Sequence, residues 1–207
     1  MMEELDLLKK DWKRNANSFE QISEVEIYKM LHKKSSSIVK WILIISILEV
    51  LLWTAISVFY NMDDYLKKNH GEFLIDFFKY FTILNYAVVA VFIYFFYKNY
   101  VQISTITSTK QLMKDIIKTR KTVQYYVWYQ LGMMSVSMII GFITAFTINP
   151  EIHKLLENQK AMVIIILICF ISLVLFVTIF WLFYRLIYGR LLRRLLNNYK
   201  ELKKIDL

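Results

Sequence analysis

The amino-acid sequence contains four apolar stretches, each close to the length that crosses a lipid bilayer as a helix. They cover residues 41–60, about 76–97, about 124–148 and 161–184. A helix that rises about 1.5 Å per residue needs about 20 residues to cross a hydrocarbon core of roughly 30 Å. The chain has 57% hydrophobic residues and one proline, which suits a helical membrane bundle better than a soluble domain. We therefore predict an all-α membrane protein, a four-transmembrane-helix bundle of two hairpins with cytoplasmic amphipathic helices.

The basic residues indicate the orientation of this bundle. Of the 26 lysines and arginines, 21 lie before the first span, between the second and third, or after the fourth. Basic residues favour the cytoplasmic side, so we expect a multi-pass protein of the bacterial inner membrane with both termini in the cytoplasm. The predicted organisation is an N-terminal helical segment, a first hairpin, a cytoplasmic amphipathic loop, a second hairpin and a basic helical tail: residues 1–40, 41–97, 98–123, 124–184 and 185–207.

The N-terminal segment shows two helix signals. Leu5, Leu8 and Trp12 share one face of a short amphipathic helix. Further along, Ser23 and Glu26 form a capping box, which predicts a second helix that begins at Glu24 and continues into the first span. We expect the apolar side chains of this segment to dock a cytoplasmic partner: Leu5, Leu8, Trp12, Phe19, Ile27 and Tyr28.

Two other cytoplasmic segments carry apolar stripes. The loop has one opposite its lysines: Ile106, Leu112, Met113, Ile116 and Ile117. The tail repeats apolar residues with the 4, 3, 4, 3 spacing of a coiled-coil seam: Tyr188, Leu192, Leu195, Tyr199 and Leu202. Such helices either lie on the membrane or pack on each other beneath the bundle, or else they dock a partner.

The net charge of +9 has its explanation in the membrane. Basic clusters flank the spans, and each such charge near the surface contributes about 1 kcal/mol of attraction to anionic lipid. We assign five side chains to lipid headgroups: Lys33, Lys34, Arg190, Arg193 and Arg194. No direct binding of nucleic acid is expected.

Small residues recur in the third span. Ser137, Gly141 and Ala145 stand four residues apart, a small-xxx-small ridge that allows another helix to approach closely. We predict that the bundle packs on this ridge. The oligomeric state is left open, with a homo-oligomer as one alternative.

Glu49 is the exceptional residue of the spans. It lies eight residues after Trp41, so about 12 Å into the bilayer and close to the midplane. Ser46, Trp53 and Ser57 share its helix face. The hydrogen-bond partners expected at similar depth are Asn85, Ser135, Ser137 and Ser172, and since none of these is cationic, we expect a protonated carboxyl group. Its role is interhelical hydrogen bonding, proton or cation handling, or assembly with another membrane subunit.

No motif of catalysis or metal binding is visible. The three histidines stand apart in sequence, no HExxH, GxSxG or Walker motif occurs, and Cys169 has no second thiol to pair with. We interpret Cys169 as a small buried apolar side chain. The sequence therefore favours a protein that is not an enzyme and has no cofactor or metal.

The opening ELDLLKKDWKRNANSF, the stretch EIYKMLHKKSSSIVKWILIISILE and the four-span layout resemble a family of uncharacterised membrane proteins from Flavobacterium-like Bacteroidota. Members have often been labelled as a carotene-cleaving oxygenase, but this sequence lacks the iron-binding histidines that such chemistry needs. The family also looks like one encoded beside alternative sigma factors, which implies an anti-sigma-like role. The His and Cys cluster of zinc-type anti-sigma domains is missing, since the N-terminal segment has only His32.

Two hypotheses for function follow. In the first, a regulatory or scaffold protein of the membrane docks a cytoplasmic partner, either a sigma factor or a subunit of a membrane complex. In the second, the bundle carries protons or a small solute along a path that includes Glu49.

Overall fold

The computed structural model describes residues 23–59, 63–68, 71–106 and 108–205. These residues contain helices and no strand: α2 (Glu24–Phe59), α3 (Asp63–Lys68), α4 (Glu72–Thr105), α5 (Thr109–Ile148), α6 (Pro150–Leu156) and α7 (Gln159–Ile205). Of these, α2, α4, α5 and α7 are long and apolar enough to cross a membrane. The predicted all-α four-helix fold is thus confirmed, and the four candidate spans indicate a multi-pass membrane protein.

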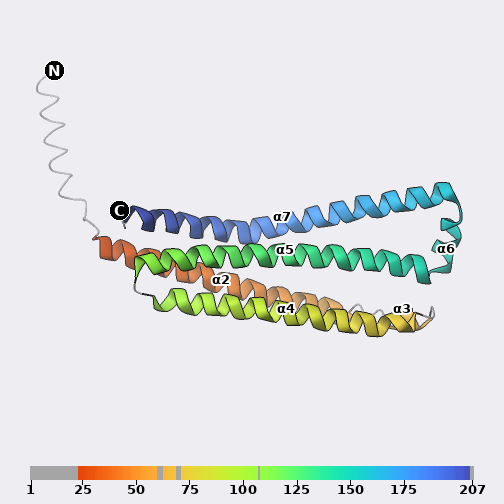
Figure 1. Ribbon diagram of the computed structural model, residues 1–207, viewed down its shortest axis with the longest axis horizontal. Helices are drawn as coiled ribbons and strands as arrows, with labels where there is room; N and C mark the ends of the chain where they lie inside the picture. The colour runs from red at the N-terminus through yellow and green to blue at the C-terminus, as the bar shows by residue number, and fades with distance from the viewer. Residues whose placement is uncertain (1–22, 60–62, 69–70, 107, 206–207) are drawn as a thin grey trace, which may run out of the picture.

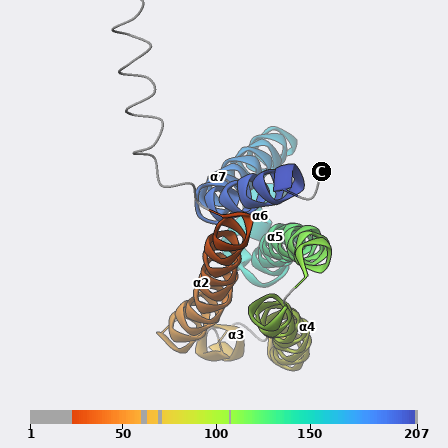
Figure 2. The same cartoon turned by 90° about the vertical axis from the view of Figure 1, so that its left-hand side faces the viewer.

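The four long helices lie side by side and alternate in direction (Figure 1). One end of the bundle holds the start of α2, the turn between α4 and α5, and the end of α7, and we call it the terminal end. The opposite end, which holds α3 and α6, is called the hairpin end. Viewed from the terminal end, the helices occupy four corners (Figure 2). Each helix packs mainly against two neighbours, in the cyclic order α2, α4, α5, α7, and α2 also contacts α5 across the bundle.

Each of the four helices continues beyond its predicted span at the terminal end. We call these extensions the stalk: residues 24–40, 98–105, 109–123 and 185–205. The segment 98–123, predicted as a separate amphipathic loop, is instead the end of α4, a short turn and the start of α5. The residues on either side of this turn are helical because the apolar stripe of the loop keeps the helical period and packs into the stalk interior.

Buried side chains are concentrated in the terminal half of the bundle. One apolar cluster lies in the stalk: Leu31, Val39, Ile103, Leu112, Ile116, Leu195 and Leu202. A second lies next to it: Ile42, Val89, Phe96, Val123, Tyr126, Leu131, Tyr184 and Tyr188. Loop and tail therefore pack on each other beneath the bundle, one of the predicted arrangements, and three seam residues of the tail are fully buried. By contrast, no residue of α7 from Gln159 to Phe183 is buried.

The start of α2 confirms the predicted capping box. The Glu26 amide donates to Ser23 Oγ at 3.3 Å, and the Ser23 amide donates to Glu26 Oε2 at 3.0 Å. Hydrogen bonds from the backbone and the hydroxyl of Ser23 lower the pKa of the Glu26 carboxyl. The predicted helix start at Glu24 is therefore correct, because the cap satisfies backbone groups that the first turn leaves free.

The small-residue ridge does not pack as predicted. Ser137 and Gly141 are exposed, Ala145 is half-buried, and apart from the adjoining backbone of α5 no described atom lies within 4 Å of a Cβ built at Gly141. The ridge lies on the same face of α5 as Gln130, because Ser137 and Gly141 follow Gln130 by seven and eleven residues, which are about two and three helical turns. Its exposure thus has a different cause: the neighbouring helices separate toward the hairpin end before they reach this level (Figure 1).

Candidate functional site

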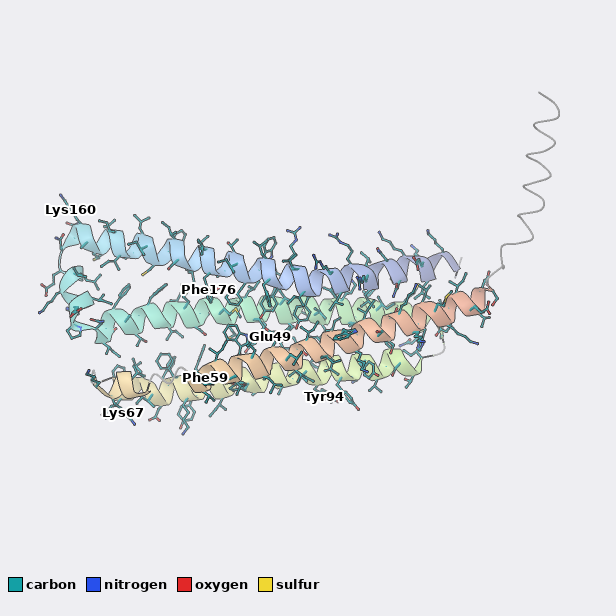
Figure 3. The ribbon with its side chains drawn as sticks, turned by 180° about the vertical axis from the view of Figure 1, so that it is seen from behind. Glu49, Phe59, Lys67, Tyr94, Lys160 and Phe176 are labelled. Atoms are coloured by element: carbon teal, nitrogen blue, oxygen red, sulfur yellow. The ribbon has the colours of Figure 1, made fainter. Side chains whose placement is uncertain are left out.

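Glu49 projects from α2 toward the space between α5 and α7 and is half-buried (Figure 3). Its carboxyl group meets four polar side chains from these two helices. Tyr126 Oη donates to Oε2 at 2.8 Å, and Tyr188 Oη donates to the same oxygen at 3.2 Å. Tyr184 Oη and Gln130 Nε2 donate to Oε1, the amide at 3.4 Å. We call these five residues the Glu49 cluster.

The spacing of these residues explains why they converge. Tyr126 and Gln130 are four residues apart on α5, and Tyr184 and Tyr188 are four apart on α7, so each pair lies on one helix face. Gln130 Nε2 also donates to Tyr126 Oη at 3.0 Å. The polar groups of each pair therefore reach the same carboxyl group.

Aromatic packing holds the hydroxyl groups in place. The rings of Tyr184 and Tyr188 stack with centroids 5.9 Å apart, and Tyr126 meets Tyr188 edge to face at 6.0 Å. Phe96 from α4 closes the other side of Tyr126 at 5.4 Å. Edge-to-face and offset pairs of this kind favour one relative orientation of the rings. The cluster thus ties α2 to both helices of the second hairpin, with α4 as its support.

The partners that the sequence suggested for Glu49 are wrong. Asn85 accepts a hydrogen bond from Tyr129 Oη at 3.0 Å instead. The hydroxyls of Ser135 and Ser172 each donate at 2.8 Å to a carbonyl of their own helix. A serine hydroxyl can donate to a backbone carbonyl of its own helix in this way, so a serine at the same depth in the membrane need not bond to Glu49.

The other members of the predicted polar stripe also differ from the prediction, either in their hydrogen bonds or in their burial. Ser46 is fully buried as expected, but its hydroxyl donates to the Leu43 carbonyl at 2.8 Å. Trp53 is half-buried and packs on Phe180, whereas Ser57 is exposed. Cys169, predicted to be buried, is half-buried. The separation of the helices toward the hairpin end accounts for the exposure of Ser57.

Sequence reasoning missed the real partners because Tyr126 and Tyr184 looked like interface anchors. Their exposed fractions are 0% and 2%, so neither faces lipid headgroups. The available signal was the Tyr-x-x-x-Gln and Tyr-x-x-x-Tyr spacing, which places two polar groups on one face of an otherwise apolar helix. In an apolar span such a pair requires a polar partner.

The depth assigned to Glu49 also changes. Tyr184 marks the end of the fourth predicted span, yet it bonds to Glu49, which was placed close to the midplane of the first. Toward the terminal end, the next charge on α2 is Lys40, about 13 Å away along the helix. On α7, the next charged residue toward that end is Arg185, which directly follows Tyr184. The carboxyl group therefore lies at the level where the apolar stretch of α7 ends, because the two helices pack with a stagger.

The chemistry of the cluster is limited to hydrogen bonding and proton exchange. Four polar groups contact the two carboxyl oxygens, and because a tyrosine hydroxyl can donate or accept, the same contacts serve a protonated or an ionised carboxyl group. In the described parts of the chain, no group of three His, Cys, Asp or Glu side chains is arranged to hold a metal ion. The cluster can link three helices, or hold and release a proton.

The predicted docking residues divide into two groups. Leu5, Leu8, Trp12 and Phe19 lie outside the described residues. Ile27 and Tyr28 pack against the stalk core, and Tyr28 Oη donates to the Ile106 carbonyl at 3.1 Å. Burial raises the pKa of the Tyr28 hydroxyl. These two side chains serve the bundle itself, so their assignment to a partner is not supported.

The predicted headgroup residues all lie on the stalk surface. Lys33 and Lys34 from α2 and Arg194 from α7 line one groove of about 650 Å³, together with Asn197 and Glu201. Arg190 and Arg193 are exposed on α7 outside this groove. Asn198, which also lines the groove, donates through Nδ2 to Ser35 Oγ at 3.0 Å, and both residues are buried. The structure thus gathers basic side chains from the two ends of the sequence.

Comparison with known proteins identifies the family. Residues 25–207 match the model of a domain of unknown function, DUF8845, so the chain belongs to that family. The match covers the stalk, the spans and the Glu49 cluster. No curated protein and no solved structure matches the chain.

Proposed function

We propose that this member of the DUF8845 family is a regulatory or scaffold protein of the membrane that holds a cytoplasmic protein partner against its stalk. The observation that carries the proposal is the continuity of the four long helices from the membrane into a packed stalk. A rigid extension of this kind keeps a binding surface at a set distance from the bilayer. The Glu49 cluster contributes by linking α2 to α5 and α7 at the base of the stalk.

Charge indicates which kind of partner fits. The stalk contains seventeen lysines and arginines but only four aspartates and glutamates. Complementary charge speeds association and selects between partners, so an acidic protein surface is the matching one. A sigma factor, implied by the family resemblance, and a subunit of a membrane complex are the two candidates.

A pull-down from native membranes in mild detergent tests the proposal. We expect wild type to retain one protein in stoichiometric amount, and the Lys33→Glu/Lys34→Glu variant to lose it. The matched control is Lys154→Glu/Lys160→Glu, which makes the same charge change at exposed positions of the hairpin end. Recovery of lipid and the protein alone, or equal retention by both variants, would contradict the proposal.

A second candidate function is proton handling by the Glu49 cluster. The observation that favours it is a groove between α5 and α7 that is lined by Tyr184 and Tyr188, two of the donors to Glu49. Vesicles that contain the purified protein and a pH-sensitive dye provide the test. The second candidate requires a proton flux that wild type shows and Glu49→Gln lacks, and no flux from wild type would exclude it.

A further inference from the structure

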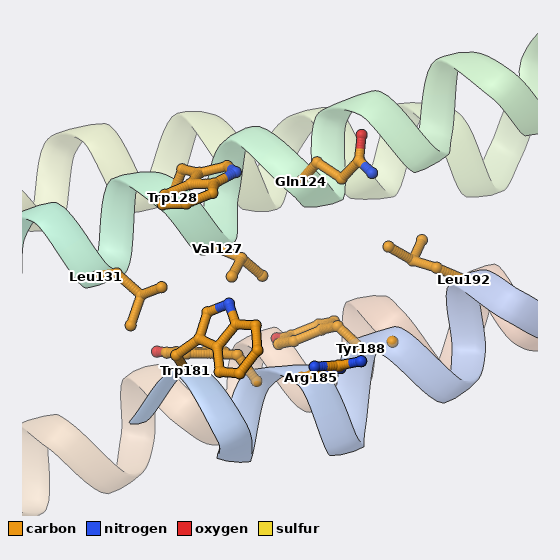
Figure 4. A pocket seen from close by; sticks show the side chains of 10 residues that line it. Gln124, Val127, Trp128, Leu131, Trp181, Arg185, Tyr188 and Leu192 are labelled. Carbon is orange, nitrogen blue, oxygen red and sulfur yellow. The ribbon is translucent and has the colours of Figure 1, made fainter. Parts of the chain in front are cut away.

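The surface between α5 and α7 carries a groove that is lined by side chains of both helices (Figure 4), among them the exposed Trp128 and Trp181. One part, of about 290 Å³, is lined among others by Gln124, Tyr184 and Arg185. The adjoining part, of about 400 Å³, is lined among others by Gly132 and Val177. Both parts share Trp128, Leu131 and Trp181, so they form one continuous groove, which we call the α5–α7 groove.

The shape of this groove suits a hydrocarbon chain. Its walls are largely apolar, and the exposed rings of Trp128 and Trp181 stand on opposite helices (Figure 4). Apart from the adjoining backbone of α5, no described atom lies within 4 Å of a Cβ built at Gly132, so the groove stays open at this position. Ligand sites commonly have volumes of roughly 300–1,000 Å³, a range into which the joined groove falls.

The polar end of the groove has a positive charge and no negative one. The Arg185 guanidinium lies 4.9 Å from the centre of the Trp181 ring, whereas Gln124 on the facing helix points away from it (Figure 4). None of the residues that line either part is acidic. Arg185 directly follows the last residue of the fourth predicted span, the level at which lipid phosphates lie. The planar guanidinium of an arginine at this level is suited to pair with a phosphate.

We propose that the α5–α7 groove binds one anionic phospholipid, with its phosphate at Arg185 and an acyl chain between Trp128 and Trp181 toward Gly132. The site is distinct from the stalk residues predicted to meet headgroups. Tyr184 and Tyr188 line the groove and also donate to Glu49, so the bound lipid lies directly against the Glu49 cluster. Binding therefore stabilises the native bundle by mass action.

Native mass spectrometry of the full chain, delipidated in detergent and titrated with phosphatidylglycerol or phosphatidylcholine, tests the proposal. We expect one phosphatidylglycerol per chain, with about tenfold weaker binding in Arg185→Gln and near wild-type binding in Arg185→Lys. The matched control is Arg193→Gln, which removes an exposed arginine outside the groove. Equal binding of both lipids, or equal loss in Arg193→Gln, would overturn the proposal.

A second pair of variants tests the acyl-chain path. Gly132→Leu fills the groove and should abolish retention of phosphatidylglycerol, whereas Ser137→Leu, at an exposed position outside it, should not. The rise in unfolding temperature with added phosphatidylglycerol should follow the same pattern. If inorganic phosphate at equal concentration displaces the lipid or replaces its stabilising effect, the site is one for free phosphate and the proposal fails.

Discussion

Replacement of Glu49 by leucine should destabilise the bundle strongly, because the carboxyl group is the shared acceptor of the cluster. The change removes the acceptor of three hydroxyls and one amide from two other helices. Gln130 and Tyr126 retain the bond between them at 3.0 Å. Tyr184 and Tyr188, each 2% exposed, are left without the partner that they have now.

The magnitude follows from these contacts. Interhelical hydrogen bonds in membrane proteins contribute about 0.6 kcal/mol on average and up to about 1.7 kcal/mol. A buried polar group left without a partner costs about 1–3 kcal/mol. Two orphaned hydroxyls cost about 2–6 kcal/mol and the two other lost bonds about 1 kcal/mol, so the free energy of unfolding should fall by roughly 3–7 kcal/mol. Leucine has a similar volume, so a cavity adds little.

Three further variants separate hydrogen bonding from other effects. Glu49→Gln keeps an acceptor oxygen and should cost less than about 1 kcal/mol. Tyr188→Phe should destabilise wild type but be neutral or stabilising in the Glu49→Leu background, because it then removes an orphaned hydroxyl. Tyr94→Phe is the matched control, since Tyr94 is 59% exposed and points away from the bundle (Figure 3).

Unfolding by sodium dodecyl sulfate in mixed micelles, followed by tryptophan fluorescence, measures these differences. A Glu49→Leu variant with the wild-type midpoint would refute the view that the cluster clamps the helices together. If Glu49→Gln falls as far as Glu49→Leu, the negative charge and not the hydrogen bonding holds the site.

Three smaller predictions follow from other contacts. Ser23→Ala should lower the helicity of the start of α2, measured by hydrogen exchange. In wild type, the Glu26 pKa is lowered, so the contribution of the cap to stability is present above the usual carboxyl pKa. This contribution fades as the pH falls through the lowered pKa. Asn198→Leu leaves the Ser35 hydroxyl without its partner and should cost about 1 kcal/mol in detergent unfolding; an unchanged midpoint would show that the pair adds nothing. Gly141→Leu should not destabilise the protein and should raise its stability by up to about 1 kcal/mol, because open space surrounds this position and leucine has the higher helix propensity; a large loss would restore the packing role predicted for the ridge.

Local signals in the sequence predicted the helices well. Hydropathy located four spans, the Ser23–Glu26 box located the start of α2, and the heptad spacing of the tail located a seam that is buried at Tyr188, Leu195 and Leu202. Each of these signals acts within one helix or one turn. Burial of an apolar stripe and satisfaction of a helix end depend little on the exact position of the other helices.

Contacts between helices were predicted poorly, and Glu49 shows why. Depth measured along each helix paired it with Asn85 and several serines, but those groups bond elsewhere. The Ser137 ridge likewise lies on the inward face of α5, yet no helix reaches it. A periodic pattern predicts the direction in which a side chain points, but it does not predict how close the neighbouring helix lies.

The sequence by itself determined that this chain forms four membrane helices in two hairpins, because hydropathy and helical period are properties of each segment alone. Only the tertiary structure decided that the loop and tail join the spans in a continuous stalk, that tyrosines surround Glu49, and that an arginine ends the α5–α7 groove. These features depend on the stagger and separation of helices that lie more than a hundred residues apart in the chain. Stagger and separation come from the sum of many side-chain contacts, which no single segment contains.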